Sequence, residues 1–203
     1  MIGVVDYRAG NAPSVGYALA RLGIEHRLVA TPGELDGVDR IVLPGVGAAR
    51  ATLDSLDASG LVDPMTSLVR DDRLPFLGIC IGLQVLFEHS EEGDTECLGW
   101  IPGSVRRFDD TDRVPQIGWN DVRLRRAHPV TERFPDGGHC YFVNSYYASP
   151  SDPDDVLGET SYGVDFCSIV AHANVVATQF HAEKSGELGL GILAAFAQWD
   201  PTC

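Results

Sequence analysis

The stretch from Leu77 to Gln84 (LGICIGLQ) constrains the fold of this chain more than any other. An apolar run, residues 74–77, leads into it and a helical pattern, residues 83–87, leaves it, which predicts a strand, a tight turn and a helix. Cys80 lies at the apex with glycine two residues away on each side, and glycine tolerates the close approach that such a turn needs. This is the pattern of a nucleophile elbow with cysteine in place of serine, and the helix end would favour a thiolate. A buried structural cysteine fits this stretch equally well.

The chain around this turn has the pattern of an open α/β sheet. Apolar runs predict strands over residues 2–6, 26–30, 40–43 and 74–79. Helical spacing predicts helices over residues 15–22, 48–57 and 61–70. Alternating strands and helices are typical of a mostly parallel sheet flanked by helices. Ligands of such sheets bind beyond the carboxyl ends of the strands, where the turns at Gly47 and Cys80 are both expected.

The second half of the chain has a different pattern, with short strands and turns in place of alternating helices. Strands are predicted over residues 104–108, 120–124, 139–147, 156–159, 165–171 and 175–180. This succession is typical of an additional antiparallel region, and a last helix is predicted over residues 186–199. Because the 203 residues contain no repeat and no linker, we expect a single domain spanning residues 1–203.

Composition excludes several classes of function. The formal net charge is −14 and the pI about 4.6, which argues against binding to nucleic acid or to an anionic membrane. No apolar run approaches the roughly 20 residues that a membrane-spanning helix needs. The five cysteines are scattered without paired spacing, so we expect neither a disulfide framework nor a metal site, and a reducing cytoplasm fits best.

A thiolate nucleophile needs a base, and the base needs a group that orients it. His181 and Glu183 follow the last predicted strand, and residues two apart on an extended segment point the same way. Glu183 could therefore fix the tautomer of His181 and stabilise the imidazolium. Taken alone, a His-x-Glu pair is more often a surface pair. We expect the other histidines at structural or surface positions: His26, His89, His128, His139 and His172.

An acyl transfer to Cys80 also needs donors for the oxyanion of a tetrahedral intermediate. The turn of Gly45, Val46 and Gly47 offers backbone N–H groups with little side-chain bulk, at a strand end beside the predicted elbow. The N–H of Ile81 would be a further donor. An ordinary strand-to-helix turn has the same composition, but the three signals agree on one place and one reaction.

Several motifs in a fixed order connect these signals. They are Asp6-Tyr7 with Gly10-Asn11 and Ser14, Leu43-Pro44-Gly45-Val46-Gly47, Gly78-x-Cys80-x-Gly82 with Gln84, Pro115-x-x-Gly118-Trp119-Asn120, Tyr141-Phe142-Val143-x-Ser145-Tyr146 and Phe180-His181-x-Glu183-Lys184-Ser185. They span nearly the whole chain. In this combination the chain resembles the class I glutamine amidotransferases, and within them most closely the glutaminase subunits of imidazole glycerol phosphate synthases of histidine biosynthesis.

The resemblance implies a flavodoxin-like fold and a reaction without a cofactor. Cys80 would attack the side-chain amide of L-glutamine, giving a glutamyl thioester and ammonia, with His181 as base and then acid and Glu183 behind it. Water would then release L-glutamate. Four positions match residues that hold the substrate in this family: Gln84, Glu92, Ser145 and Tyr146. Glu92, otherwise part of a solvated acidic turn, would pair with the ammonium group of the substrate.

The resemblance also implies a partner. In the family, ammonia passes through the core of a (β/α)₈-barrel cyclase subunit in a heterodimer, which makes imidazole glycerol phosphate and AICAR. The positions that match partner-facing residues are Arg113, Trp119, Asn120, Tyr141 and Lys184. A core aromatic and a solvated lysine are the ordinary interpretations of Trp119 and Lys184. Lys184 is nevertheless the only lysine among the 15 basic residues, and the other 14 are arginines. This indicates that the position needs the compact ammonium group of lysine rather than the larger guanidinium group of arginine.

The chain departs from the family pattern at a few positions. Ala182 replaces a usual proline, Asn144 and Gln116 replace frequent histidines, and Arg8-Ala9 occupies a turn that usually carries glycine and small or apolar residues. None is a predicted catalytic residue. Three alternatives remain open: a paralogue that supplies ammonia to another synthase, in nucleotide-sugar or natural-product biosynthesis, a cysteine hydrolase or peptidase-like enzyme on the same sheet, and an inactive scaffold. The Phe-His-x-Glu motif and Gln84 argue against the hydrolase, and the intact Cys80 argues against the scaffold.

Overall fold

The computed structural model describes residues 1–8, 11–109 and 113–201. Ala9 and Gly10, which belong to the motifs named above, and the fifth cysteine, Cys203, lie outside these residues. The chain folds around a mixed sheet with two distinct parts. One part is parallel and flanked by helices, and the other is mostly antiparallel and carries a three-stranded branch. This is the architecture that the sequence predicts.

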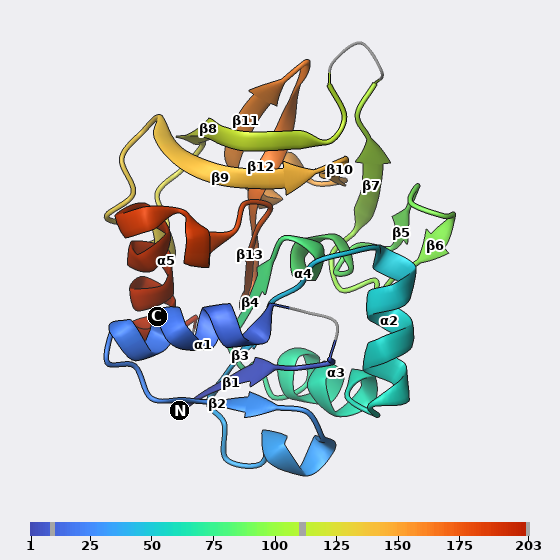
Figure 1. The fold of residues 1–203 in the computed structure, drawn as a ribbon, viewed down its shortest axis with the longest axis vertical. Helices are drawn as coiled ribbons and strands as arrows, with labels where there is room; N and C mark the ends of the chain where they lie inside the picture. The colour runs from blue at the N-terminus through green and yellow to red at the C-terminus, as the bar shows by residue number, and fades with distance from the viewer. Residues whose placement is uncertain (9–10, 110–112, 202–203) are drawn as a thin grey trace.

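The parallel part consists of five strands that run side by side. Their order is β2 (His26–Val29), β1 (Ile2–Val5), β3 (Arg40–Leu43), β4 (Phe76–Ile79) and β13 (Val175–Thr178). Figure 1 shows α1 (Ala12–Arg21) and α5 (Gly186–Gln198) on one side of these strands, and α2 (Ala49–Ala58) and α3 (Val62–Arg70) on the other. Alternate strand residues feed two separate apolar cores, one beneath each pair of helices. β1, β4 and β13 are buried on both faces and therefore read as continuous apolar runs, whereas β2 at the edge of the sheet is half-buried or exposed over most of its length.

The antiparallel part continues the same sheet beyond β13. It adds β12 (Val164–His172), β10 (Tyr146–Pro150) and β7 (Gly103–Arg107), followed by the two-residue strands β5 (His89–Ser90) and β6 (Thr95–Glu96). A branch leaves β12 through β11 (Val156–Tyr162), β8 (Gln116–Leu124) and β9 (Gly138–Asn144). Figure 1 shows this branch stacked above the parallel strands.

Short elements join these strands. They are the four-residue helix α4 (Ile81–Gln84) and the 3₁₀ turns η1 (Pro32–Leu35), η2 (Pro129–Thr131), η3 (Pro153–Asp155) and η4 (Ala182–Lys184). Three differences from the predicted elements bear on the site. The helix expected at residues 83–87 begins earlier, directly after Cys80. The strand expected over 139–147 is interrupted at Ser145, and the one expected over 175–180 ends at Thr178.

Candidate active site

Cys80 connects a strand to a helix by itself, as the predicted elbow requires. β4 ends at Ile79 and α4 begins at Ile81, so Cys80 is the whole turn. Its backbone has φ 57° and ψ −108°, a conformation that residues other than glycine rarely adopt. The backbone N–H of Cys80 donates to the carbonyl of Thr178 at 2.8 Å, which holds the turn against β13. Such strain at a residue that is only 7% exposed is typical of a functional position.

The two glycines beside Cys80 allow the helix to lie directly on the sheet. A Cβ atom at Gly78 would lie 2.4 Å from the carbonyl oxygen of Gly82. A Cβ atom at Gly82 would lie 2.0 Å from the carbonyl oxygen of Leu43. Because both obstacles are backbone atoms, neither could move aside without shifting a strand or the helix. The Gly-x-Cys-x-Gly pattern therefore follows from close backbone approach on both sides of the thiol.

His181 and Glu183 meet beneath this elbow. His181 Nδ1 and Glu183 Oε1 lie 3.0 Å apart, and the two side chains are 3% and 1% exposed. The predicted pair therefore forms, but the expected conformation was wrong. β13 ends at Thr178, and Glu183 lies in the 3₁₀ turn η4 rather than on an extended strand. The turn is fixed in place because Ser185 Oγ donates to the carbonyl of His181 at 2.7 Å and accepts from the N–H of Tyr141 at 3.0 Å.

The surroundings of His181 favour its protonated form. Burial alone would lower the pKa of His181, but the hydrogen bonds and charges of Cys80 and Glu183 outweigh it and raise this pKa to about 9. An imidazole that holds its proton beside a cysteine sulfur can supply that proton to a leaving group. The arrangement is therefore suited to acyl transfer on sulfur.

Asn11 is a member of this cluster that the sequence analysis gave no role. Its Nδ2 donates to Glu183 Oε1 at 2.7 Å, across 172 positions of the chain. Asn11 is also the N-cap of α1, where an asparagine side chain commonly accepts from the first turn. Here it makes no such capping bond. The amide is thus committed to Glu183, a contact between distant segments that no local pattern reveals.

Burial distinguishes His181 from the other histidines. His89, His139 and His172 also lie against carboxylates, but their side chains are 41%, 66% and 41% exposed. The other described thiols lie outside the lining of the cavity at Cys80. Burial raises the pKa of Cys97 to about 11 and that of Cys140 to about 12. Burial, followed by nearby carboxylates, also raises the pKa of Cys167, so these three thiols are held in the neutral form.

A cavity of about 260 Å³ opens above Cys80. Its lining includes the four predicted substrate-binding residues: Gln84, Glu92, Ser145 and Tyr146. It also includes Pro115, Val143 and Asn144, which the sequence analysis did not assign to the substrate site. Their position at the junctions of β8, β9 and β10 depends on strand pairing between distant segments. Gly47 and Cys80 also line this cavity, so the prediction that their two turns face one crevice is confirmed, while the roles of the substrate-binding candidates stay predictions.

The predicted oxyanion donors divide into two groups. Val46, Gly47 and Ile81 line the cavity, and Gly47 has φ 100°. Gly45 is buried behind them, where a Cβ atom would collide with Ile81 and Tyr7. Ile81 opens α4, and the first N–H groups of a helix have no acceptor within it. The backbone of Ile81 and Gly47 is thus better placed than that of Gly45 to meet a ligand.

Comparison with known proteins follows this geometry. A family model described as glutamine amidotransferase class-I matches residues 4–197. The chain belongs to this family. Curated relatives include the imidazole glycerol phosphate synthase subunit HisH of Dehalococcoides mccartyi, 47% identical over 197 residues, with 97% of this chain and 96% of the relative covered. The HisH subunit of Thiobacillus denitrificans is 44% identical over 211 residues, with 98% and 92% covered.

Solved structures carry the same fold at lower identity. A crystal structure described as glutamine amidotransferase has a TM-score of 0.76 and 22% identity, with 96% of this chain and 98% of that chain covered. PurLQS from Thermotoga maritima has a TM-score of 0.74 and 19% identity, with 97% of each chain covered. At these identities the likeness establishes the fold alone. The predicted fold class and the predicted family resemblance are both confirmed.

Two departures from the family motifs lie opposite each other in this amidotransferase. Gln116 on β8 and Asn144 on β9 are directly paired in the strand register. Their side chains are buried, at 3% and 5% exposed. Gln116 Oε1 and Asn144 Oδ1 both lack a hydrogen-bond partner among the described residues. The two amide side chains are thus neighbours in one buried region beside the cavity. The two departures from the family motifs therefore change the same place in the structure.

An outward apolar face adjoins the same cavity. On β8 and β9, Ile117 pairs with Val143 and Trp119 pairs with Tyr141, and the two aromatic rings lie 6.0 Å apart. Ile117 and Trp119 are 61% and 56% exposed. We call these four residues the outer β8–β9 face. Exposed apolar patches next to a site mark interaction surfaces.

The remaining partner-facing candidates lie at different places. Lys184 is exposed in η4, and its backbone N–H donates to the carbonyl of His181 at 3.0 Å, so it is joined directly to the turn that carries His181 and Glu183. Asn120 points away from its neighbour Trp119, and its Nδ2 donates to the carbonyl of Ser161 at 2.9 Å. Arg113 is exposed, and its carbonyl accepts from the hydroxyl of Tyr162 at 2.5 Å.

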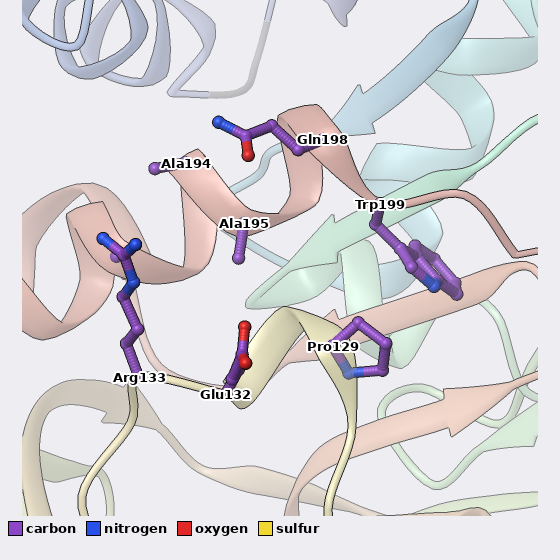
Figure 2. Close-up of a pocket in the computed structure, with 8 residues that line it drawn as sticks. Pro129, Glu132, Arg133, Ala194, Ala195, Gln198 and Trp199 are labelled. Carbon is purple, nitrogen blue, oxygen red and sulfur yellow. The ribbon is translucent and has the colours of Figure 1, made fainter. Parts of the chain in front are cut away.

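A second cavity, of about 280 Å³, lies between η2 and α5. Figure 2 shows Pro129, Glu132 and Arg133 on one side of it and Ala194, Ala195 and Gln198 of α5 on the other. Its lining contains no cysteine or histidine, unlike the lining of the cavity at Cys80. Among the described residues, no three His, Cys, Asp or Glu side chains are grouped so that they could hold a metal ion. No helix in the described part of the chain is long and apolar enough to cross a membrane.

Proposed function

We propose that this amidotransferase is the glutaminase subunit of an imidazole glycerol phosphate synthase. It hydrolyses L-glutamine to L-glutamate and ammonia, and it delivers the ammonia to a (β/α)₈-barrel cyclase subunit in a heterodimer. The observation that carries the proposal is the buried His181–Glu183 pair against Cys80, at the base of a cavity. The identity of 42–47% to HisH subunits over nearly the whole chain supports the choice of synthase.

The first half of the reaction forms a thioester. The Cys80 thiolate attacks the side-chain carbonyl carbon of glutamine, a C–S bond forms, and the carbonyl electrons move to oxygen. Backbone N–H groups of Gly47 and Ile81 stabilise the oxyanion. His181 then gives its proton to the amide nitrogen, the C–N bond breaks, and ammonia leaves. Glu183 and Asn11 hold the imidazole in the orientation that makes this transfer possible.

The second half releases glutamate. His181, now neutral, takes a proton from water as the water oxygen attacks the thioester carbon. The C–S bond breaks, and the thiolate and the protonated His181 are both restored. The cycle uses no metal or cofactor, because the chain supplies nucleophile, acid, base and oxyanion donors itself.

The cavity supplies polar groups suited to an amino acid substrate. Gln84 Nε2 is already bonded to the carbonyl of Tyr146 at 3.0 Å, which leaves Gln84 Oε1 for the substrate. Glu92 contributes a carboxylate for the substrate ammonium, and it is held in place by the N–H of Ala49, which donates to Glu92 Oε2 at 2.8 Å. Ser145 and Tyr146 complete this wall.

The outer β8–β9 face is the proposed contact with the cyclase subunit. It is apolar and exposed, and Val143 belongs both to this face and to the lining of the cavity. Trp119 and Tyr141 are the residue types that most often dominate interface energies. Lys184 and Arg113 would lie at its polar rim, together with the backbone of Asn120. The chain would act in the cytoplasm, consistent with the four free cysteines among the described residues.

The decisive experiment measures glutamate release with and without the cyclase subunit and its phosphorylated ribonucleotide substrate. We expect a low basal rate that rises by about 10²-fold or more in the complete complex, because ammonia production has value only when its acceptor is bound. An unchanged rate with the cognate cyclase, together with stimulation by a different synthase, would assign the chain to the paralogue.

A further inference from the structure

Gln179 lies in the catalytic cluster without a role in the reaction as written above. It follows the last residue of β13 and precedes Phe180 and His181. Its side chain is fully buried, and its backbone N–H donates to the carbonyl of Ser168 at 2.9 Å, which fixes the position of its Cα atom on the sheet. A buried amide side chain is costly unless its polar atoms find partners. The partners of this amide are therefore informative.

A chain of hydrogen bonds determines which way the Gln179 amide faces. It starts at the carbonyl of Tyr146, which can only accept, and to which Gln84 Nε2 donates at 3.0 Å. The same Nε2 donates to Gln179 Oε1 at 3.0 Å. Amide oxygen and nitrogen are distinguished by such networks, so the oxygen of Gln179 must face Gln84. Its Nε2 then faces the other way.

The nitrogen of Gln179 faces the nucleophile. Gln179 Nε2 lies 3.8 Å from Cys80 Sγ, and within the described residues this sulfur is the acceptor recorded for it. A neutral thiol is a weak acceptor, whereas hydrogen bonds to an ionised acceptor are about twice as strong. The free-energy cost of burying this N–H donor is therefore well compensated only when Cys80 is a negatively charged thiolate.

We propose that Gln179 is a catalytic residue that donates a hydrogen bond to the Cys80 thiolate. Its amide approaches the sulfur as a neutral donor, while His181 supplies the opposite charge. Gln84 acts as its positioning residue, because it holds Gln179 Oε1 and thereby directs Nε2 at the sulfur. The inference rests on one element of the proposed function, the assignment of Cys80 as the nucleophile. It can be tested without glutamine, because the reactivity of the Cys80 thiolate can be measured by alkylation.

The test measures the rate at which iodoacetamide alkylates Cys80 as a function of pH, in the full-length chain, with the modified peptide quantified by mass spectrometry. In Gln179→Met, which has a similar volume and no donor, the midpoint of alkylation should move to higher pH by roughly one unit. The rate at neutral pH should fall about tenfold accordingly. An unshifted midpoint in this variant overturns the proposal.

A matched control separates this effect from loss of stability. Asn174 is also a buried amide beside β13, 3% exposed, and its Nδ2 donates to the carbonyls of Val69 and Leu74 at 2.9 and 2.7 Å. It lies at the opposite end of the strand from Cys80. Asn174→Ala should lower the melting temperature and leave the alkylation midpoint unchanged. An equal shift in this control would show that destabilisation alone explains the result, which also overturns the proposal.

A second variant keeps the inference testable if Gln179→Met does not fold. Gln84→Met removes the donor that orients Gln179, so the midpoint should move in the same direction by a smaller amount. No movement in Gln84→Met contradicts the positioning role. The proposed function fails separately, if Cys80→Ala still hydrolyses glutamine. Loss of hydrolysis in Cys80→Ala with unshifted midpoints in both glutamine variants would refute the present inference alone.

Discussion

The two parts of the sheet divide the work of the site between them. The parallel strands β1, β4 and β13 are buried along their whole length, and the turns after β3, β4 and β13 carry Gly47, Cys80 and His181. The strands β8 and β9 alternate between buried and exposed positions. β9 contributes Val143 and Asn144 to the lining of the cavity, and the two strands together form the outer β8–β9 face. The groups proposed to react thus follow strands of the parallel part, whereas the proposed contact with the cyclase lies mainly on the antiparallel part.

The largest expected effect tests whether the parallel part alone supplies the nucleophile. Cys80→Ala should abolish glutamate release, a loss of about 10³-fold or more, because no other thiol of the described residues lines the cavity. Binding to the cyclase should persist, since the outer β8–β9 face is untouched. Steady-state glutamate release and calorimetric titration with the cyclase measure the two properties separately.

Cys97→Ala is the control for this variant. Cys97 is a half-buried free thiol outside the cavity, and its neutral form is favoured by burial. The substitution should leave glutamate release within about twofold of the wild type, as expected for a site away from the chemistry. Comparable losses in both variants would contradict the assignment of Cys80.

The next effect belongs to the antiparallel part. Trp119→Ala removes the largest exposed aromatic of the outer β8–β9 face, and truncation of such an anchor typically costs about 2 kcal/mol. The dissociation constant for the cyclase should therefore rise about 30-fold. Calorimetric titration of the variant against the wild type measures this change.

Leu28→Ala provides the comparison at the other edge of the sheet. Leu28 lies on β2 and is 42% exposed, so it is an apolar surface residue far along the strand order from β8 and β9. Its truncation should leave the affinity for the cyclase unchanged. A loss of affinity at Leu28 with none at Trp119 would place the interface on the parallel part instead.

The parallel part was also the more predictable from the sequence. Most of its strands are buried apolar runs, and the glycines around Cys80 mark the elbow directly. The pairing of His181 with Glu183 was predicted from their spacing, although a 3₁₀ turn and not a strand brings them together. Local patterns suffice where a motif is contiguous, because the backbone itself then sets the geometry.

The antiparallel part, and the contacts of Asn11 and Gln179, were harder to predict from the sequence. The alternation of residues 139–147 continues through Ser145, so nothing marks the break between β9 and β10. The strands β5 and β6 have two residues each, too few to form a pattern. Asn11 and Gln179 act across 172 and 99 positions. Contacts of this kind depend on the assembled sheet, and they are where the structure adds most.

The pH dependence of kcat/KM tests the proposed role of His181 as a proton donor. Because its pKa is raised to about 9, His181 should remain protonated at neutral pH and lose its proton above pH 9. The proton for the leaving ammonia is then missing, so kcat/KM should fall about tenfold per pH unit above that point. A rate profile between pH 6 and pH 10.5 measures this. A rate that rises throughout this range would show that neutral His181 is the active form.

The same shift has a consequence for stability. The folded-state pKa of His181 lies above its ordinary value of 6.5, so protonation of His181 stabilises the fold fully below pH 6.5. This contribution is lost as the pH rises from 6.5 through 9. Glu183→Gln removes one of the interactions that raise the pKa of His181. The variant should therefore be less stable than the wild type at low pH, and the difference between their free energies of unfolding should become smaller as the pH rises from 6.5 to 9. Urea unfolding at several pH values measures the difference, and a constant difference would contradict the linkage.

The smallest expected effect concerns the contact that joins α1 to the catalytic turn. Asn11→Ala removes one of the two hydrogen bonds to Glu183 Oε1, and a hydrogen bond to a charged group contributes about 1.5–3 kcal/mol. Because Glu183 could still hold His181 without it, kcat should fall only about tenfold. KM should change little, since Asn11 does not line the cavity.

Asn11→Ser distinguishes this role from helix capping, because serine is a good N-cap but is too short to reach Glu183. A serine variant as slow as the alanine variant, but with its melting temperature restored, would tie Asn11 to the reaction through Glu183, whereas full recovery of kcat in the serine variant would reduce Asn11 to a cap of α1.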